Sequence, residues 1–281
     1  MQIGDYPAQE PLSDFGRSYQ EECLRLSEGI GGAEHRYDTG HPSQGLLVFP
    51  AARPNGTVLA FMHGGGWTNG YKEMMAFLAP PLNQAGISFV SIGYRLAPEF
   101  TFPAGWLDAA KAMRWVYDHC AQFGGDPGRI FLGGHSAGAH QAALLAVRTD
   151  WLASHRLPEN PVRGCLPISG TYYFTEGSGL SMRPRFLGPA GQGNEVHASP
   201  IHYLDRAPPP MLIAHGSADF PHLSKQARDM EQRIRSAGGQ VERIELPGCD
   251  HLGAVYCAAR TDGPWLPHAL KFMAAPPERR L

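Results

Sequence analysis

The chain has 281 residues, of which 43% are hydrophobic and 18% charged, and its formal net charge is −2. This is ordinary globular composition with ample apolar material for a large core. Acidic and basic residues nearly balance and neither forms a long run, so we expect no nucleic acid and no membrane as partner. No segment approaches the roughly 18 consecutive apolar residues that a membrane helix needs.

The start of the chain predicts a helix and no secretory signal. Residues 1–16, MQIGDYPAQEPLSDFG, are too acidic and too proline-broken for a signal peptide, so we expect a cytoplasmic protein. A helical pattern runs from about Leu12 to Glu28. The chain's five cysteines are widely spaced and form no C-x-x-C motif, which favours buried, reduced thiols over disulfides.

Short apolar runs recur along the chain, separated by Gly-rich turns and helical patterns. They predict strands at 57–63, 87–94, 129–135, 164–169, 210–216 and 241–246. Several are apolar almost throughout, as strands covered on both faces must be. Apolar spacing predicts helices around 109–120 and 223–234. This alternation favours an α/β fold with a mostly parallel central sheet flanked by helices, in a single domain over 1–281. Residues 170–207, rich in Pro, Gly and aromatics, predict a small cap together with residues 1–30.

Three successive glycines follow the first predicted strand, in the stretch HGGGW from His63 to Trp67. Glycine loses more backbone freedom on folding than any other residue, so this run indicates either a loose linker or bare backbone needed by a ligand. A P-loop is excluded because no Gly-Lys-Ser/Thr follows, and a dinucleotide fingerprint is excluded by the glycine spacing.

Gly134-His135-Ser136-Ala137-Gly138 fits the G-x-S-x-G pattern, a sharp strand-to-helix turn that exposes a serine hydroxyl. The pattern alone is weak, and a structural glycine-rich turn is the alternative. Its context favours the nucleophile, because an apolar strand precedes it and an alanine-rich helix follows. The sequence therefore predicts Ser136 as a nucleophile.

A serine nucleophile needs a base, and the base needs a carboxylate partner. His251 follows the last predicted strand and Asp219 follows the strand before it, so both lie at the same sheet edge as Ser136. Asp250 is the poorer acid because successive side chains diverge. The order Ser136, Asp219, His251 is the chain order of hydrolases built around such an elbow.

The glycines now have a chemical explanation. Attack on a carbonyl creates an oxyanion, which fixed backbone N–H groups hold. Gly65 and Gly66 can present such groups, and Ala137 supplies another just after the nucleophile. We expect His63 to brace the loop. Trp67 either lines the acyl pocket or packs in the core. His135 is a further candidate for the substrate pocket.

The histidines do not predict a metal centre. His215, His222 and His251 lack H-x-x-x-H or H-x-H clustering with carboxylates, so we expect no metal and no cofactor.

The strings HGGGW, GYRLAPE, FPAGWLDAAKAMRWV, GGDPGRIFLGGHSAGAH, HGSADF and GCDHLG together resemble the α/β-hydrolase superfamily, specifically its hormone-sensitive-lipase-like carboxylesterases. HGGGW and GHSAGAH are also similar to kynurenine formamidase and to feruloyl and acetyl esterases. The resemblance covers about residues 45–275 and implies the α/β-hydrolase fold, no cofactor, and the roles given above for Ser136, Asp219 and His251. The expectation of a homodimer rests on this resemblance alone. The sequence departs from the lipase-like pattern in DFPHL after Asp219 and in its short cap.

We therefore expect a serine hydrolase that cleaves short-chain or aryl carboxylic esters through an acyl-enzyme. An arylformamidase that hydrolyses an amide of the N-formylkynurenine type is the alternative. A hydrolase-fold binding protein without activity is a third alternative, and it is disfavoured because all three catalytic candidates are present.

Overall fold

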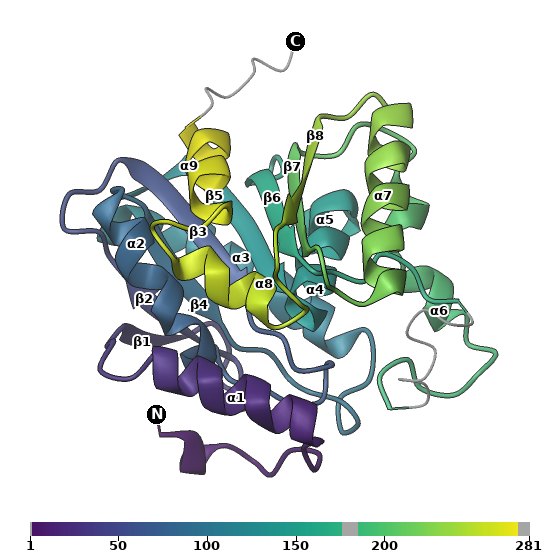
Figure 1. The fold of residues 1–281 in the computed structure, drawn as a ribbon, viewed down its shortest axis with the longest axis horizontal. Coiled ribbons are helices and arrows are strands. Elements are labelled where there is room, and N and C mark those ends of the chain that lie inside the picture. Colours follow the sequence, from purple (N-terminus) through teal and green to yellow (C-terminus); the bar gives the residue numbers. More distant parts are fainter. Residues whose placement is uncertain (1, 176–184, 275–281) are drawn as a thin grey trace.

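The computed structural model describes residues 2–175 and 185–274 (Figure 1). Residues 176–184, part of the predicted cap segment 170–207, lie outside the described residues. So do residue 1 and residues 275–281, which the single-domain prediction includes.

Within the described residues the strands form one eight-stranded sheet in the order β1-β2-β4-β3-β5-β6-β7-β8. The strands are β1 (Ala33–Arg36), β2 (Gly45–Phe49), β3 (Gly56–Met62), β4 (Ser88–Ile92), β5 (Gly125–His135), β6 (Val162–Ile168), β7 (Met211–Gly216) and β8 (Val241–Leu246). Strands β3 to β8 pair in parallel, whereas β1 and β2 pair antiparallel at one edge. The predicted mostly parallel sheet is confirmed, and each of the six predicted strands is found.

Strands β1 and β2 were not predicted from the sequence. All four residues of β1 are exposed, because this strand lies at the edge of the sheet. Strand β2 is buried but only five residues long, and no helix separates it from its neighbours in the chain. The helix–strand alternation that identified the other strands is therefore absent here.

Helices cover both faces of the sheet (Figure 1). The α-helices are α1 (Asp14–Leu26), α2 (Ala79–Gln84), α3 (Ala104–His119), α4 (Ala137–Val147), α5 (Asp150–Ser154), α6 (Asn194–His197), α7 (Pro221–Ser236), α8 (Gly253–Tyr256) and α9 (Trp265–Ala274). Short 3-10 helices are η1 (Ile3–Asp5), η2 (Lys72–Leu78), η3 (Cys120–Phe123), η5 (Pro200–Tyr203) and η6 (Cys257–Ala259). Strand β3 illustrates the two cores: Val58, Ala60 and Met62 pack toward α3 and α4, and Leu59 and Phe61 toward η2 and α9.

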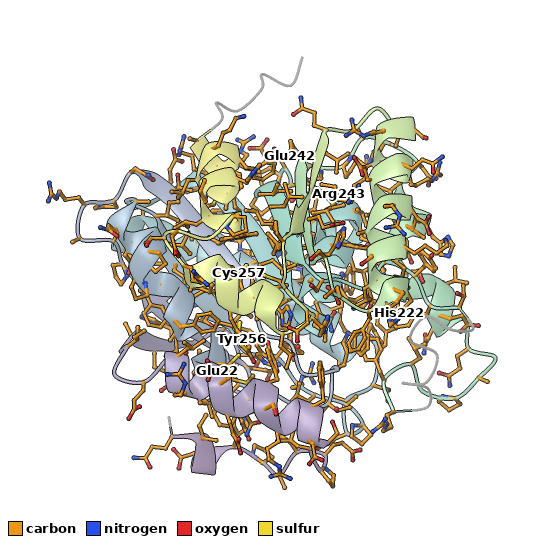
Figure 2. All side chains as sticks on the ribbon, in the orientation of Figure 1. Glu22, His222, Glu242, Arg243, Tyr256 and Cys257 are labelled. Carbon is orange, nitrogen blue, oxygen red and sulfur yellow. The ribbon has the colours of Figure 1, made fainter. Side chains whose placement is uncertain are left out.

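Helix α1 lies near the predicted limits of Leu12 and Glu28. The side chain of Ser13 caps it by accepting a hydrogen bond from the Gly16 N–H at 3.2 Å. Tyr19 and Cys23, one turn apart, form its buried face, which packs against η2. Tyr256, from α8, lies beside α1 (Figure 2). Its ring lies 6.5 Å from the ring of Tyr19. Helix α1 thus packs against η2 and contacts α8 through Tyr256.

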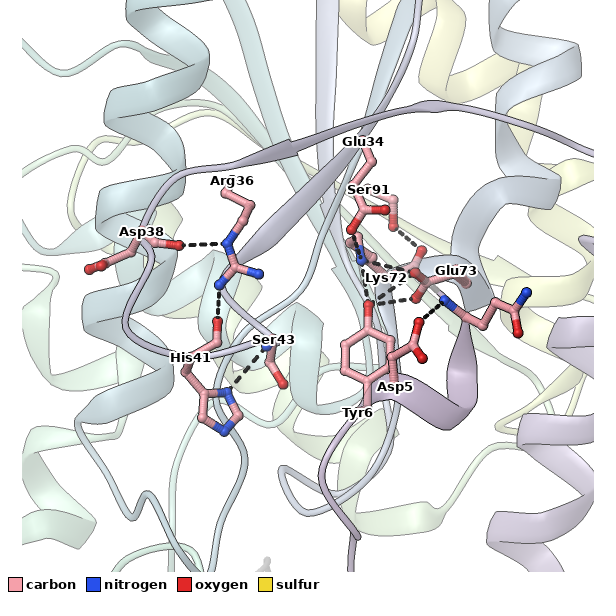
Figure 3. A network of polar contacts seen from close by, with 11 residues as sticks. Asp5, Tyr6, Glu34, Arg36, Asp38, His41, Ser43, Lys72, Glu73 and Ser91 are labelled. Carbon is pink, nitrogen blue, oxygen red and sulfur yellow. Dashed lines mark hydrogen bonds and ion pairs between the residues drawn. The ribbon is translucent and has the colours of Figure 1, made fainter.

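A buried lysine anchors the residues that precede α1 (Figure 3). The side chain of Lys72 is 1% exposed and forms ion pairs with Glu73 at 2.9 Å and Glu34 at 3.3 Å. Its ammonium also donates to the hydroxyl of Tyr6, which in turn donates to Glu73. Burial, and then the charge of Glu73, raise the pKa of Tyr6 well above its ordinary value, so this hydroxyl stays protonated.

Candidate active site

The three candidate catalytic residues lie at the carboxyl edge of the sheet, where parallel strands end side by side. Ser136 follows β5 directly, Asp219 lies three residues after β7, and His251 lies in the loop after β8. In open α/β sheets this edge is where ligands bind.

Ser136 has the strained backbone of a strand-to-helix elbow, with φ 53° and ψ −117°. Its N–H donates to Ile168 O at 2.9 Å, and its carbonyl accepts from the N–H of His140 at 3.0 Å. A Cβ at Gly134 would lie 2.3 Å from the Gly138 backbone, and one at Gly138 would lie 2.2 Å from Met62 O. Close packing of strand against helix thus requires both glycines and keeps the serine in its strained conformation.

Ser136, His251 and Asp219 form a continuous chain of hydrogen bonds. His251 Nε2 lies 2.9 Å from Ser136 Oγ, and His251 Nδ1 lies 2.9 Å from Asp219 Oδ1. An ionised carboxylate can only accept, so Nδ1 carries the proton and Nε2 is free to accept the serine proton. The arrangement can generate a serine alkoxide by transferring its proton to the imidazole.

Asp219 is held by two donors besides His251. Ser169 Oγ donates to its second carboxylate oxygen, and the Phe220 N–H donates to the first at 2.7 Å. Burial alone would raise the pKa of Asp219, but hydrogen bonds from His251 and Ser169 outweigh it and lower the pKa to about 2. Ser169 was not predicted from the sequence, although its place at the end of the predicted strand 164–169 was a usable signal.

Gly65 and Gly66 adopt positive φ angles of 120° and 62°. Gly65 O accepts from the N–H groups of Thr68 and Asn69, and a Cβ at Gly65 would lie 2.0 Å from Asn69 O. Among the described residues, the N–H groups of Gly65 and Gly66 donate to no protein acceptor, and both glycines line the cavity that contains Ser136. Ala137 is the first residue of α4, where an N–H has no acceptor within the helix.

A buried chain of hydrogen bonds connects α1 to this loop and to His251. The Gly64 N–H donates to Tyr19 Oη at 3.2 Å, and Tyr19 Oη donates to His135 Nδ1 at 2.9 Å. His135 Nε2–H then donates to His251 O at 3.0 Å. Burial, and then the charge of His251, lower the pKa of His135 to about 3, so its ring is neutral near pH 7. His135 lines the cavity yet is only 1% exposed, so its main contacts brace the base.

Sequence analysis did not assign Tyr19 to the site. Its hydroxyl forms hydrogen bonds with Gly64, 45 positions away in the chain, and with His135, 116 positions away. The available signal was its position on the apolar face of the predicted helix, one turn before Cys23. That signal indicates burial without indicating what the hydroxyl contacts.

His63 and Trp67 flank the glycines and make structural contacts. His63 Nδ1 donates to Gly64 O at 2.7 Å, and its ring stacks on Tyr94 with centroids 4.4 Å apart. Trp67 Nε1 donates to His140 Nδ1 at 3.1 Å, and its indole stacks on Phe186 at 4.5 Å. Trp67 is not among the described residues that line the cavity, which favours the packing alternative over a role in the acyl pocket.

The cavity at Ser136 has a volume of about 350 Å³. Helix α1 and its preceding residues form one wall, and the Gly65–Gly70 loop and Phe220 form others. A larger cavity of about 770 Å³ lies at the opposite edge of the sheet, near the starts of β5 and β6. The larger cavity is therefore remote from the Ser136–His251–Asp219 chain.

The described part of the chain shows no metal-binding cluster, no membrane-spanning helix and no disulfide. Over residues 2–175 and 185–274, no group of three or more His, Cys, Asp or Glu side chains is arranged to hold a metal ion. In that part of the chain no helix has the length and apolarity needed to cross a membrane. All five cysteines are described and unpaired; four are buried and Cys249 is half-buried.

Known proteins share this fold and parts of this sequence. A family described as alpha/beta hydrolase fold matches residues 59–254. Esterase LipQ of Mycobacterium tuberculosis is 31% identical over 251 residues, which are 84% of this chain and 58% of that protein. Kynurenine formamidase of Salmo salar is 28% identical over 252 residues, covering 86% of this chain and 79% of that protein. A hyperthermophilic esterase from Pyrobaculum calidifontis has a TM-score of 0.74 at 21% identity, covering 92% of this chain and 90% of that chain.

The chain is shorter than its mycobacterial relatives. It spans 58% of the length of LipQ and 55% of the length of Esterase LipC from the same organism.

Proposed function

The chain belongs to the α/β-hydrolase family, and we propose that it hydrolyses carboxylic esters through an acyl-enzyme on Ser136. The observation that carries this proposal is the hydrogen-bonded chain of Ser136, His251 and Asp219. A serine hydroxyl is a weak nucleophile near neutral pH unless a base takes its proton, and His251 Nε2 is within reach to do so.

The reaction follows from these contacts. Ser136 Oγ attacks the ester carbonyl carbon while its proton passes to His251 Nε2, and the carbonyl oxygen becomes an oxyanion. The N–H groups of Gly65, Gly66 and Ala137 hold this oxyanion; one such donor can contribute about 10²–10³ in rate. The tetrahedral species collapses as His251 returns the proton to the leaving alcohol. Water, deprotonated by His251, then attacks the acyl-enzyme, and the acid is released as Ser136 regains its proton.

The substrate is a small ester. A cavity of about 350 Å³ is at the lower end of the range for small-molecule sites, which supports short-chain or aryl esters over long-chain lipids. The names of the relatives support ester hydrolysis too, since LipQ and LipC are both esterases.

Hydrolysis of a formamide is the second candidate. The same nucleophile, base and oxyanion donors can cleave an amide. The observation in its favour is the match to kynurenine formamidase, which extends over 79% of that protein, whereas the matches to LipQ and LipC extend over little more than half. Its identity of 28% is lower than the 31% and 33% of the two esterases.

An inactive binding protein is the third candidate, and the hydrogen-bonded arrangement of Ser136, His251 and Asp219 argues against it. A binding protein has no need for a strained serine whose hydroxyl faces an imidazole held by a buried carboxylate. We further propose that residues 1–30 and 170–207 form a cap. A cytoplasmic location and a homodimer remain predictions.

The test compares substrates and traps the nucleophile. We expect kcat/KM for p-nitrophenyl acetate or butyrate to exceed that for N-formylkynurenine by about 100-fold, and p-nitrophenyl octanoate to be poorer than the short esters. A fluorophosphonate should label the peptide that contains Ser136 and spare the peptide with Ser169, a serine of the same site. Preference for the formamide would replace the esterase proposal with an arylformamidase. Absence of both turnover and labelling would exclude the mechanism.

A further inference from the structure

Two phenylalanine rings lie beside the imidazole of His251. The ring centroid of Phe220, the residue after Asp219, lies 5.0 Å from that of His251. Phe15, in the first turn of α1, lies 6.1 Å from His251 and 5.7 Å from Phe220. Both phenylalanines line the cavity that contains Ser136. We call Phe15 and Phe220 the aromatic pair.

The aromatic pair is unusually exposed. Phe15 is 47% exposed and Phe220 is 42% exposed, and they are two of the four large hydrophobic side chains with such exposure in the described residues. The other two, Leu107 and Val196, are not among the residues that line this cavity. A single exposed apolar side chain is normal, but two in contact inside a cavity mark a surface on which an apolar ligand packs.

The position of His251 indicates which part of an ester meets the aromatic pair. The carbonyl oxygen must point at Gly65 and Gly66, whereas the leaving oxygen must lie near His251 Nε2, which protonates it. Groups that pack against the imidazole are therefore nearest the leaving alcohol. Both rings of the aromatic pair contact the imidazole.

We propose that the aromatic pair is a binding subsite for an aromatic leaving group, so that the preferred substrates are esters of benzyl-type or phenolic alcohols. Aromatic rings 4.5–7 Å apart in tilted or offset arrangements attract one another beyond simple area burial. The two rings of the pair are themselves tilted by 53°, and both residues line the cavity. The inference rests on the proposed ester hydrolysis and specifies its substrate class.

The experiment compares two acetates that differ only in the aromaticity of the alcohol, benzyl acetate and cyclohexylmethyl acetate. The two alcohols have similar size and acidity, and both reactions form the same acetyl-enzyme. Because kcat/KM covers only the steps up to acyl-enzyme formation, its ratio for the two acetates reports how the leaving group is bound. Methyl phenylacetate and methyl cyclohexylacetate form a second pair, with the aromatic ring on the acyl side.

The variants Phe15→Leu and Phe220→Leu remove a ring but keep an apolar side chain. We expect each to lower the benzyl-to-cyclohexylmethyl ratio by about twofold to tenfold and to leave the ratio of the two methyl esters unchanged. Phe100→Leu is the matched control, because Phe100 is a half-exposed ring that makes an edge-to-face contact with His41 and does not line this cavity. Thermal unfolding checks that all three variants fold, and any general disturbance of His251 cancels in the ratio.

Each alternative result has a distinct meaning. If both substitutions leave the benzyl-to-cyclohexylmethyl ratio at its original value while Ser136→Ala abolishes hydrolysis, the subsite is wrong and the esterase proposal stands. If the two methyl esters respond instead, the aromatic pair binds the acyl group and the leaving-group assignment is wrong. If the unmodified protein hydrolyses none of the four esters, the proposed function fails and the subsite fails with it.

Discussion

The strand-edge loops and the N-terminal segment, residues 2–26, meet at one cavity but are held there in different ways. Ser136, Asp219 and His251 follow parallel strands of the sheet, and hydrogen bonds to one another hold their side chains. The N-terminal segment belongs to no strand of the sheet. Besides the packing of α1, it is attached through polar contacts of single side chains, such as those of Tyr6 and Tyr19.

This difference suggests a division of tasks. The strand-edge loops carry the proposed chemistry, which requires rigid geometry, and the N-terminal segment shapes the wall where substrate binds. Changes in the loops should therefore abolish turnover, whereas changes in the N-terminal segment should alter it by smaller factors.

The largest effect is expected for Ser136→Ala. Removing the nucleophile should lower kcat/KM on p-nitrophenyl acetate by about 10⁴-fold or more, leaving only what the oxyanion donors provide. Steady-state kinetics measures this, with Ser154→Ala as the control, a serine of α5 whose hydroxyl bonds the carbonyl of Trp151. A variant that retains a tenth of the activity would contradict the role of Ser136.

Asp219→Asn should have the second largest effect. The amide cannot stabilise the imidazolium and can hold the imidazole in the wrong tautomer, so we expect kcat to fall by about 10³-fold or more. Asp250→Asn is the matched control, because Asp250 adjoins His251 but accepts from the Gly253 N–H at 2.7 Å. Equal losses in the two variants would mean that the loop conformation, not the carboxylate of Asp219, limits turnover.

The same carboxylate should make folding stability depend on pH. The pKa of Asp219 is lowered from 3.8 to about 2, so the folded state favours its ionised form. Its contribution of about 2 kcal/mol, roughly thirtyfold in the folding equilibrium, is fully present above about pH 4 and is lost as the pH falls toward 2. Urea unfolding between pH 6 and 2 measures this: the difference in free energy of unfolding between the unmodified protein and Asp219→Asn should shrink as the pH falls. A constant gap would contradict the lowered pKa.

Tyr19→Phe tests the N-terminal segment at its point of contact with the loops. Loss of the hydroxyl leaves the Gly64 N–H and His135 Nδ1 without their partner, and a buried unpaired group costs about 1–3 kcal/mol. We expect kcat/KM to fall by about tenfold as the glycine loop and the base lose this link.

Tyr256→Phe is the matched control for Tyr19→Phe. The Tyr256 ring lies 6.5 Å from the Tyr19 ring, and within the described part of the chain its buried hydroxyl has no hydrogen-bond partner. Its removal should leave both kcat/KM and stability near their original values. A comparable loss in both variants would show that the rings matter and the Tyr19 hydroxyl does not.

The contrast between the two regions also explains what could be predicted from sequence. Apolar strands and the Ser136 elbow leave local patterns, so the sheet and the residues at its carboxyl edge could be predicted from the sequence. Other contacts form only after folding. Ser169 bonds Asp219, 50 positions away in the chain, and Tyr19 bonds His135, 116 positions away. The exposure of Phe15 likewise depends on where α1 docks, which its helical pattern does not specify.

The smallest effect is expected for Tyr6→Phe, which loosens the anchor of the N-terminal segment. Lys72 keeps its ion pairs with Glu73 and Glu34, so the buried charge stays compensated and only the contacts of one hydroxyl are lost. We expect hydrogen exchange over residues 3–26 to speed up and kcat/KM on benzyl acetate to fall by about threefold, because Phe15 is then held less firmly. Tyr71→Phe is the control, since its ring packs in a tilted arrangement against Tyr6, with centroids 4.9 Å apart, but its hydroxyl is not part of the Lys72 contacts. If exchange quickens while kcat/KM on benzyl acetate is unchanged, the segment covers the site without shaping it, and the task that we assign to the N-terminal segment is wrong.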